Sequence, residues 1–358
     1  MQLTRRQFVG ASAAALFPSI WIKRVDTKPV GWAILGLGYY ATVEIMPNFA
    51  HTDAAKIVGL ISGHPEKLAR FGERYQVASG SRYLYDQMEA IASDPEIEVV
   101  YVITPPATHP AFAIRAAHSG KHVCSEKPMA PTPADCRRMI DACRKNRRLL
   151  QIGYRCHYEA HNLWAMDKLR SGKLGKIKQL SSDHGFSIPA GTWRTQKALA
   201  GGGSMMDIGI YSLNALRYLS GEEPVEVTAS ISSAKDDPRF ADVEDTVDFS
   251  LKFPSGLEGK GTSGYSWVQG KNRYRVECEG GVIEADPATP YGGHRTTLNG
   301  QAVPISPNNQ FAAQVEQFSK CVREGGAPKT PGVEGLRDIR IIEAIYRSGA
   351  TGQPVRLS

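Results

Sequence analysis

Short apolar runs alternate with amphipathic stretches through the first part of the chain. The apolar runs predict strands at residues 30–35, 56–61, 99–103, 122–124 and 149–153, and the amphipathic stretches predict helices at residues 39–49, 65–75, 86–92, 110–119 and 133–146. The run at 99–103 is apolar throughout, as expected of a central parallel strand that is covered on both faces. Strands and helices that alternate at this spacing predict a doubly wound parallel sheet.

The pattern changes after residue 155, where strands with alternating apolar and polar residues begin to dominate. Such alternation is typical of an antiparallel sheet with one covered face. Helices are predicted at residues 160–170, 311–323 and 333–347, and strands at residues 176–183, 225–232, 246–253, 257–265, 274–278 and 281–285. The predicted fold class is an α/β Rossmann domain followed by an α+β domain with an open, mainly antiparallel sheet. We place the Rossmann domain at 29–155, the substrate and oligomerisation domain at 156–308, and C-terminal helices that pack back toward the Rossmann domain at 309–358.

Composition narrows the class of protein. The chain has 358 residues, of which 42% are hydrophobic and 22% charged, as in a globular protein of two domains. Its net charge is +7, but the densest basic run, at 137–148, is interleaved with apolar residues and is typical of a solvated helix face, so we expect no nucleic-acid partner. The six cysteines form no CxxC pair, which predicts free, mostly buried thiols and no metal site. No apolar run reaches the roughly 20 residues of a membrane span, so no stable membrane insertion is predicted.

The first 28 residues differ from the rest. A charged start containing Arg5 and Arg6 precedes a short apolar stretch of small residues at 10–22. This build is typical of an export signal, and the arginine pair before Gln7 and Phe8 resembles the twin-arginine signal, which exports folded proteins. We therefore expect a periplasmic protein. The alternative is an N-terminal arm or a short core helix.

A glycine-rich turn follows the first predicted strand and opens the first predicted helix. It has the pattern G-x-G-x-x-A and consists of Gly36, Leu37, Gly38, Tyr39, Tyr40 and Ala41. In a dinucleotide site the first glycine permits the tight turn, the second lets the backbone approach a pyrophosphate, and the small third residue lets helix and strand pack closely. In this strand–turn–helix setting the pattern predicts dinucleotide binding.

The end of the second strand distinguishes NADP from NAD. An NAD site has a carboxylate there for the ribose 2′-hydroxyl, whereas this strand ends at Ser62 and Gly63, and Lys67 and Arg70 follow on the next helix. A hydroxyl and cations suit a 2′-phosphate. Glu66 is the one acid nearby and is expected to be a solvated helix residue, so the sequence favours NADP.

Two further segments carry reactive side chains. Glu126-Lys127-Pro128 follows a predicted strand, at the edge where ligands of open α/β sheets bind, although a lysine there is also compatible with a surface charge. Asp207 and Tyr211 follow the glycine-rich run 201–203. If the segment that contains them is helical, they are four residues apart and share a face of the helix. The alternative for this pair is a core tyrosine and a carboxylate at a helix N-terminus.

In this order along the chain, the glycine fingerprint, Glu126-Lys127-Pro128 and the Asp-x-Gly-x-aromatic segment resemble the glucose–fructose oxidoreductase/inositol dehydrogenase family, from Pro29 to Arg356. Most members carry His at the last position of that segment, where this chain has Tyr211. The stretches 62–67, 152–158, 193–194 and 200–214 are similar to the glucose–fructose oxidoreductase type, which holds NADP permanently, and to a related type in which a second aldose accepts the hydride.

The resemblance implies roles for named residues. It places Ser62, Gly63 and Lys67 at the 2′-phosphate, Thr104, Pro105 and His109 along the cofactor crevice, Glu126 and Lys127 near the nicotinamide, Trp193, Arg194 and Tyr265 over it, and Tyr154, Arg155, Asp207 and Tyr211 at the substrate. It also implies a homo-oligomer that forms through the outer face of the second sheet.

The hypothesis that follows is a sugar oxidoreductase with tightly bound NADP. It oxidises an aldose at C1 to a lactone and then reduces a second sugar, a ketose or an aldose, to an alditol. Tyr211 moves the proton, but a free tyrosine has a pKa near 10 and needs a cation beside it. We expect Lys127 to supply that charge and Asp207 to orient Lys127 or the sugar hydroxyls.

Two rival functions remain open. One is an ordinary NADP-dependent sugar or cyclitol dehydrogenase that exchanges its cofactor with solution. The other is a non-catalytic protein that binds NADP or a sugar and kept the fold; the presence of Lys127, Asp207 and Tyr211 argues against it. The expected periplasmic location favours the first hypothesis, in which NADP stays bound and is oxidised again by a second sugar. An exported enzyme that released NADPH would stop after one turnover if no free cofactor surrounded it.

The export signal gives the first testable prediction. Exchanging Arg5→Lys together with Arg6→Lys keeps the charge and removes the arginine pair that the pathway recognises. The variant is expected to accumulate in the cytoplasm, folded and with its cofactor, as measured by fractionation. Normal export of this double variant would show that the pair is incidental.

Overall fold

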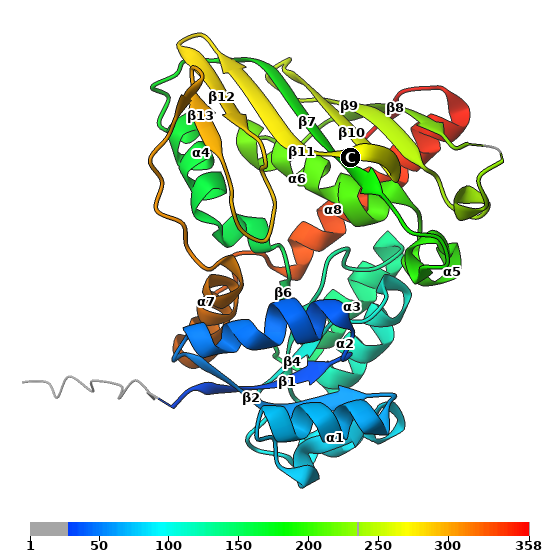
Figure 1. Cartoon of the computed structure of the whole chain (residues 1–358), viewed down its shortest axis with the longest axis vertical. Helices are drawn as coiled ribbons and strands as arrows, with labels where there is room; N and C mark the ends of the chain where they lie inside the picture. Colours follow the sequence, from blue (N-terminus) through cyan, green and yellow to red (C-terminus); the bar gives the residue numbers. More distant parts are fainter. Residues whose placement is uncertain (1–27, 235, 358) are drawn as a thin grey trace, which may run out of the picture.

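The computed structural model describes residues 28–234 and 236–357, so the predicted export signal lies outside the described residues apart from its last position. The described residues form two domains that are stacked along the long axis of the molecule, with the first domain in the lower half of Figure 1.

The first domain is built on a six-stranded sheet in the order β3-β2-β1-β4-β5-β6, in which every neighbouring pair is parallel. Its strands are β1 (Val30–Leu35), β2 (Ala55–Ser62), β3 (Arg82–Leu84), β4 (Val99–Val102), β5 (His122–Ser125) and β6 (Leu150–Ile152), and its α-helices are α1 (Pro65–Arg74), α2 (His109–His118) and α3 (Pro133–Lys145). The chain reverses its direction across the sheet between β1 and β4, as in a doubly wound dinucleotide-binding domain. The predicted Rossmann fold is confirmed.

The second domain carries a nine-stranded sheet in the order β14-β13-β12-β11-β7-β10-β9-β8-β15. Its strands are β7 (Ile177–Ser187), β8 (Glu226–Ser232), β9 (Thr246–Lys252), β10 (Glu258–Gly264), β11 (Ser266–Cys278), β12 (Gly281–Ala285), β13 (Thr296–Leu298), β14 (Gln301–Ala302) and β15 (Val355–Arg356). The helices of this half are α4 (Ala160–Arg170), α5 (Lys197–Ala200), α6 (Ile210–Ser220), α7 (Gln310–Glu324) and α8 (Gly332–Thr351). β7 and β10 pair in parallel and the other neighbours pair antiparallel, so the predicted mainly antiparallel sheet is confirmed.

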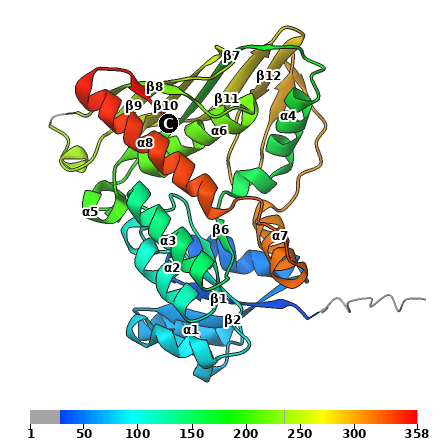
Figure 2. The ribbon, with the colours of Figure 1, turned by 180° about the vertical axis from the view of Figure 1, so that it is seen from behind.

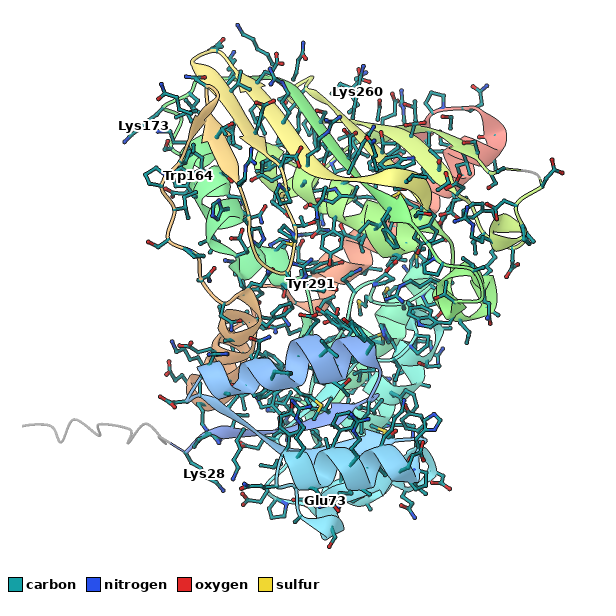
Figure 3. The ribbon with its side chains drawn as sticks, in the orientation of Figure 1. Lys28, Glu73, Trp164, Lys173, Lys260 and Tyr291 are labelled. Atoms are coloured by element: carbon teal, nitrogen blue, oxygen red, sulfur yellow. The ribbon has the colours of Figure 1, made fainter. Side chains whose placement is uncertain are left out.

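The two faces of the second sheet differ in polarity. Helices α4, α6 and α8 cover one face, as Figure 2 shows from behind, and the alternate strand residues Val247, Phe249 and Leu251 are buried beneath them. The opposite face carries polar side chains, of which Lys260 on β10 points outward in Figure 3 and Arg275 on β11 pairs with Glu284. The alternation of apolar and polar residues therefore reports which face is covered.

Several elements differ from the sequence prediction. The short strands β3, β13, β14 and β15 were not predicted, because strands of two or three residues leave no apolar run. β7 continues past the predicted end at Asp183, and β11 begins eight residues before Tyr274. Both extensions are polar or contain glycine, and they pair with each other from Ser266 to Lys271 only through an irregular register. The predicted first helix is a π-helical turn (Tyr40–Ile45) that continues as a 3-10 helix (Met46–His51), and the helix predicted at 86–92 is a 3-10 helix (Tyr85–Ser93).

The C-terminal helices bind the two domains together. α7 packs on the first domain, where Phe318 contacts Trp32 edge-on at 5.7 Å between ring centroids and the Trp32 indole donates to Ser319 at 3.0 Å. α8 packs against α3 of the first domain and β8 of the second.

All six cysteines are buried and free, as predicted. Within 28–234 and 236–357, none of the helices has both the length and the apolar character needed to cross a membrane.

A buried ion pair connects α6 to α8 and gives a prediction about stability. Asp338 is fully buried and accepts a hydrogen bond from Arg217 at 2.6 Å. Asp338→Ala leaves Arg217 buried with only Glu223 and Glu334, so we expect a loss of about 3 kcal/mol in the free energy of unfolding. Asp141→Ala is the matched control, because it breaks an exposed pair with Arg144 and should cost at most about 1 kcal/mol. Denaturant unfolding measures both, and equal losses would contradict the prediction.

Candidate functional site

A cavity of about 710 Å³ lies between the glycine fingerprint and the second domain. The residues that line it include Gly38, Tyr39, Tyr40, Ala41, Thr104, Pro105, Glu126, Lys127, Arg155, Trp193, Arg194, Asp207, Tyr211, Asn272, Thr289, Pro290 and Tyr291. A larger hollow of about 890 Å³ is lined by exposed polar residues of β7, β10 and β11 and contains no fingerprint residue. The chemistry predicted from the sequence therefore belongs to the first cavity.

The fingerprint has the geometry that a pyrophosphate requires. Gly36 has a φ of +94°, and a Cβ there would lie 2.4 Å from the carbonyl oxygen of Ile103, so only glycine fits this turn. A Cβ on Gly38 would meet nothing within 4 Å, so its backbone is open to a ligand. Ala41 is buried and lets the helix pack on the sheet. Gly36 and the buried Leu37 shape the turn without lining the cavity. These residues fit a dinucleotide.

The residues predicted at the 2′-phosphate lie next to the fingerprint, at the carboxyl end of β2. The amide of Gly36 donates to Ile61 at 2.9 Å, which places Ser62 and Gly63 beside the turn and outside the cavity lining. The Ser62 side chain accepts from the amide of His64 at 3.2 Å. Lys67 follows in the first turn of α1 and is partly exposed. Glu66 pairs with His64 at 3.2 Å on the surface, as expected of a solvated helix residue.

The predicted crevice residues divide into two groups. Thr104 and Pro105 line the cavity, whereas His109 is buried and is not among the lining residues, so its place in the cofactor crevice stays a prediction. The His109 ring lies 2.7 Å from the carbonyl oxygen of Thr104 through Nε2 and 3.1 Å from that of Pro128 through Nδ1. Burial lowers the pKa of His109. This side chain joins the loops that follow β4 and β5 and supports the crevice from behind.

Glu126 is held from below by the first domain. It accepts a hydrogen bond from the Tyr101 hydroxyl at 2.6 Å, and Tyr101 accepts one from Gln314 of α7 at 2.9 Å. Burial raises the pKa of Glu126, and the Tyr101 hydrogen bond and the charge of Lys127 oppose this rise without cancelling it. The carboxyl of Glu126 at the cavity wall is thus held by Tyr101, which is itself held by Gln314 of α7.

Lys127 reaches across to the second domain. Its ammonium donates to the carbonyl oxygen of Asp207 at 2.7 Å, lies 3.6 Å from the carboxylate of Asp207, and stands 4.7 Å from the centroid of the Tyr211 ring. The predicted contact between Lys127 and Asp207 is therefore present. The ammonium faces the ring of Tyr211 and not its hydroxyl.

Asp207 lies in a π-helical turn (Met205–Gly209) that leads into α6. Its carboxylate is 3.1 Å from Arg194 and accepts from the Tyr265 hydroxyl at 2.9 Å. Burial raises the pKa of Asp207, but the charges of Lys127 and Arg194 outweigh burial and hold the pKa below its usual value. Asp207 therefore stays ionised and keeps Lys127 in place.

Three predicted residues surround this carboxylate in different ways. Trp193 and Arg194 line the cavity, and the Arg194 guanidinium stacks 4.5 Å from the centroid of the Trp193 ring. Tyr265 is fully buried and lies outside the lining, so its place over the nicotinamide stays a prediction. It reaches the site only through Asp207.

Tyr211 and Arg155 form the other half of the site. Arg155 donates to the Tyr211 hydroxyl at 3.1 Å. Burial raises the pKa of Tyr211, and the charge of Arg155 opposes this rise. The cation predicted beside the hydroxyl is thus Arg155 and not Lys127. Tyr154, predicted at the substrate, is buried outside the lining and packs near His157, so its contact with substrate stays a prediction.

The sequence analysis missed the segment that closes the cavity from the sheet of the second domain. Asn272 of β11 accepts from the amides of Ala288 and Thr289, and so presents Thr289, Pro290 and Tyr291 to the cavity. Tyr291 lies between the two domains in Figure 3 and is half exposed. No periodic pattern marks this segment; the Pro and Gly residues around it indicated only a turn.

Comparisons with known proteins place the chain. A profile described as "Oxidoreductase family, NAD-binding Rossmann fold" matches residues 30–154, and one described as "GFO/IDH/MocA C-terminal domain" matches residues 163–284. A solved aldose-aldose oxidoreductase from Caulobacter crescentus, complexed with glycerol, is 49% identical with a TM-score of 0.89 and covers 92% of this chain and 100% of its own. D-xylose 1-dehydrogenase [NADP(+)] from Haloarcula marismortui is 28% identical over 94% of this chain and 96% of its own length. A levoglucosan dehydrogenase complexed with NADH and levoglucosan, 22% identical with a TM-score of 0.78 over 92% of this chain and 99% of its own, shares the fold.

The end of β2 gives a prediction about cofactor choice. Ser62→Asp with Lys67→Ala removes the two predicted partners of a 2′-phosphate and adds a charge that would repel it. Each charged hydrogen bond lost is expected to cost about 1.5–3 kcal/mol, so binding should shift from NADP toward NAD. Calorimetric titration of both nucleotides measures the ratio, with Glu66→Gln as a control that should leave it unchanged. Undiminished NADP binding in the double variant would refute the assignment.

Proposed function

Since this chain belongs to the GFO/IDH/MocA family of oxidoreductases, we propose that it oxidises an aldose at C1 to an aldonolactone with a tightly bound NADP and then reduces a second sugar, a ketose or an aldose, to an alditol. One observation carries this proposal: Lys127, Asp207 and Tyr211 converge in the cavity that the fingerprint opens into. The 49% identity to an aldose-aldose oxidoreductase supports the sugar class.

Each side chain has a task in this reaction. A bound nicotinamide would supply the hydride chemistry, and the fingerprint residues Gly36, Gly38 and Ala41 would hold the dinucleotide. The Tyr211 side chain, as the tyrosinate, takes the proton of the C1 hydroxyl and, as the phenol, later returns it to the acceptor carbonyl oxygen. Lys127 donates a hydrogen bond to that same oxygen and polarises it. Asp207 holds the Lys127 ammonium between the two domains, so this hydrogen-bond donor is already oriented when the sugar binds.

A second function is favoured by one comparison. The NADP-dependent xylose dehydrogenase relative suggests an ordinary dehydrogenase that exchanges its cofactor with solution. Such an enzyme would be purified without nucleotide and would need added NADP for each turnover. A non-catalytic sugar- or NADP-binding protein would bind either ligand and change the absorbance of neither.

The closed cycle also fits a protein that is exported in the folded state with NADP inside. We propose a periplasmic location on the arginine pair at Arg5 and Arg6. We further propose a homo-oligomer that forms through the polar outer face of the second sheet, where Lys260 and Arg275 are exposed. Light scattering tests the assembly: a monomer would reject it.

Half-reactions test the function and the role of Tyr211 together. Protein purified without added nucleotide and then denatured should release NADP, and adding an aldose to the native protein should produce the absorbance of reduced nicotinamide. Fructose or a second aldose should then discharge it. Tyr211→Phe keeps the ring and its packing, and should slow both half-reactions by about 10²–10⁴-fold.

The outcomes separate the rival functions. Nucleotide-free protein that becomes active with added NADP indicates an exchanging dehydrogenase. A Tyr211→Phe variant that is slowed only in reduction would show that another group deprotonates the donor. Wild-type rates in both directions would make Tyr211 a wall of the pocket and nothing more.

A further inference from the structure

Arg155 is a buried cation whose hydrogen-bond partners are all neutral. It follows β6 in a short 3-10 helix (Arg155–Tyr158) and is only 3% exposed. One Nη donates to Gln310 at 2.7 Å and to the carbonyl of Pro290 at 3.0 Å, and the other donates to the carbonyl of Thr289 at 2.6 Å and to the Tyr211 hydroxyl at 3.1 Å. Throughout the described part of the chain, no carboxylate forms an ion pair with Arg155, and its Nε has no acceptor.

A buried charge without a counter-ion is strongly unfavourable. The cost falls when a negative charge develops on an atom that the guanidinium already contacts. Three of the four acceptors are carbonyl or amide oxygens, which cannot ionise. Only the Tyr211 hydroxyl can lose a proton and become the missing anion.

The other cations of the cavity contact Asp207. Lys127 and Arg194 both lie against Asp207, and the Lys127 ammonium faces the Tyr211 ring. Arg155 is held by Thr289 of the second domain and by Gln310 of α7, so its position does not depend on sugar. The charge near the hydroxyl is therefore present before the reaction begins.

We propose that Arg155 is the residue that turns Tyr211 into a base: its guanidinium stabilises the tyrosinate, which leaves Lys127 free to act on the sugar oxygen. This inference rests on the proposed function, because it gives the tyrosinate its substrate. Arg155 acts through Tyr211 and is a positioning residue.

The step balances without another reagent. The tyrosinate oxygen takes the proton of the C1 hydroxyl, the C1–H electron pair leaves with its proton as hydride to the nicotinamide, and the C1–O bond becomes a carbonyl. Tyr211 is then a neutral phenol that still accepts from Arg155. When the second sugar is reduced, its carbonyl oxygen takes the phenol proton and the tyrosinate returns. The proton and the hydride both stay within the cycle.

The groups around Tyr211 set the direction of the pH dependence. Burial raises the pKa of Tyr211, Arg155 lowers it, and Cys156 and Glu126 raise it. His184 stacks at 5.8 Å but stays neutral near pH 7, because burial lowers its pKa to about 3. The remaining charged groups are Lys127 and Arg194, which share the carboxylate of Asp207. The phenols of Tyr40, Tyr218 and Tyr291 are also near, and their pKa values are all raised. Without Arg155 the Tyr211 pKa must rise, so sugar oxidation must need a higher pH.

The experiment compares Arg155→Met and Arg155→Lys in the protein with its bound cofactor. The Met variant should move the rising limb of the pH profile for aldose oxidation upward by about 1–3 units, which is a loss of about 10–10³-fold in rate at a fixed pH on that limb. Arg155→Lys keeps the charge and should recover part of the shift. In a Tyr211→Phe background, Arg155→Met should cause no further loss, because the group that it assists is gone.

Arg217→Lys is the matched control, since Arg217 is also buried and hydrogen-bonded but lies in the ion-pair cluster of α6 and α8. It should lower thermal stability without moving the pH profile. A shift as large as that of Arg155→Met would mean that general loosening of the fold causes the effect, and would overturn the proposal. A raised KM with an unmoved limb in Arg155→Met would make Arg155 a sugar-binding residue and would also overturn it.

A readout without turnover separates this inference from the proposed function. Fluorotyrosine incorporation lowers the phenol pKa and gives a fluorine resonance for Tyr211, assigned by its loss in Tyr211→Phe. Arg155→Met should raise the pH at which this resonance titrates, whether or not any sugar is oxidised. If aldoses leave the cofactor unchanged but the resonance shifts, the sugar function fails and the Arg155 assignment stands. An unshifted resonance refutes the assignment even in an active enzyme.

Discussion

The contact between Lys127 and Asp207 is the interaction on which the site depends. It joins the carboxyl edge of the first sheet to the first turn of the helical segment that carries Tyr211, so it fixes the two domains in the register that forms the cavity. Asp207 is held in turn by Arg194 and Tyr265, which come from two further segments of the second domain. Without this carboxylate the ammonium would face Arg155 and Arg194 without a counter-ion, and their mutual repulsion would force it outward.

The charges of the cavity are distributed by burial. Asp207 lies between two cations and stays ionised, whereas Glu126 is buried against Tyr101 and its pKa is raised. Two carboxyl groups in one site are thus pushed in opposite directions, as in enzymes that assign them different tasks. Arg155 adds a positive charge that no carboxylate in the described residues neutralises, next to the one hydroxyl that can carry the balancing charge.

The C-terminal helices explain why the site is rigid although two domains form it. α7 lies on the first domain through Phe318 and Ser319, and it sends Gln314 to Tyr101 and Gln310 to Arg155. α8 spans both domains through its packing on α3 and β8. The side chains that face the cavity are therefore supported by residues about 150 to 210 positions away in the chain, and a hinge motion between the domains would have to break these contacts.

The sequence by itself determined the two fold classes and the chemistry of the main residues. Apolar periodicity predicted the central strands, and the turn between Gly36 and Ala41 predicted the dinucleotide edge, because both signals are local and depend on backbone geometry alone. The family resemblance named Lys127, Asp207 and Tyr211, which lie together in the structure, and also His109, Tyr154 and Tyr265, which are buried and do not line the cavity. Only the tertiary structure decided which cation meets the Tyr211 hydroxyl and that Thr289 and Tyr291 close the site, because such contacts join residues far apart in the chain and are fixed by how the helices and sheets pack.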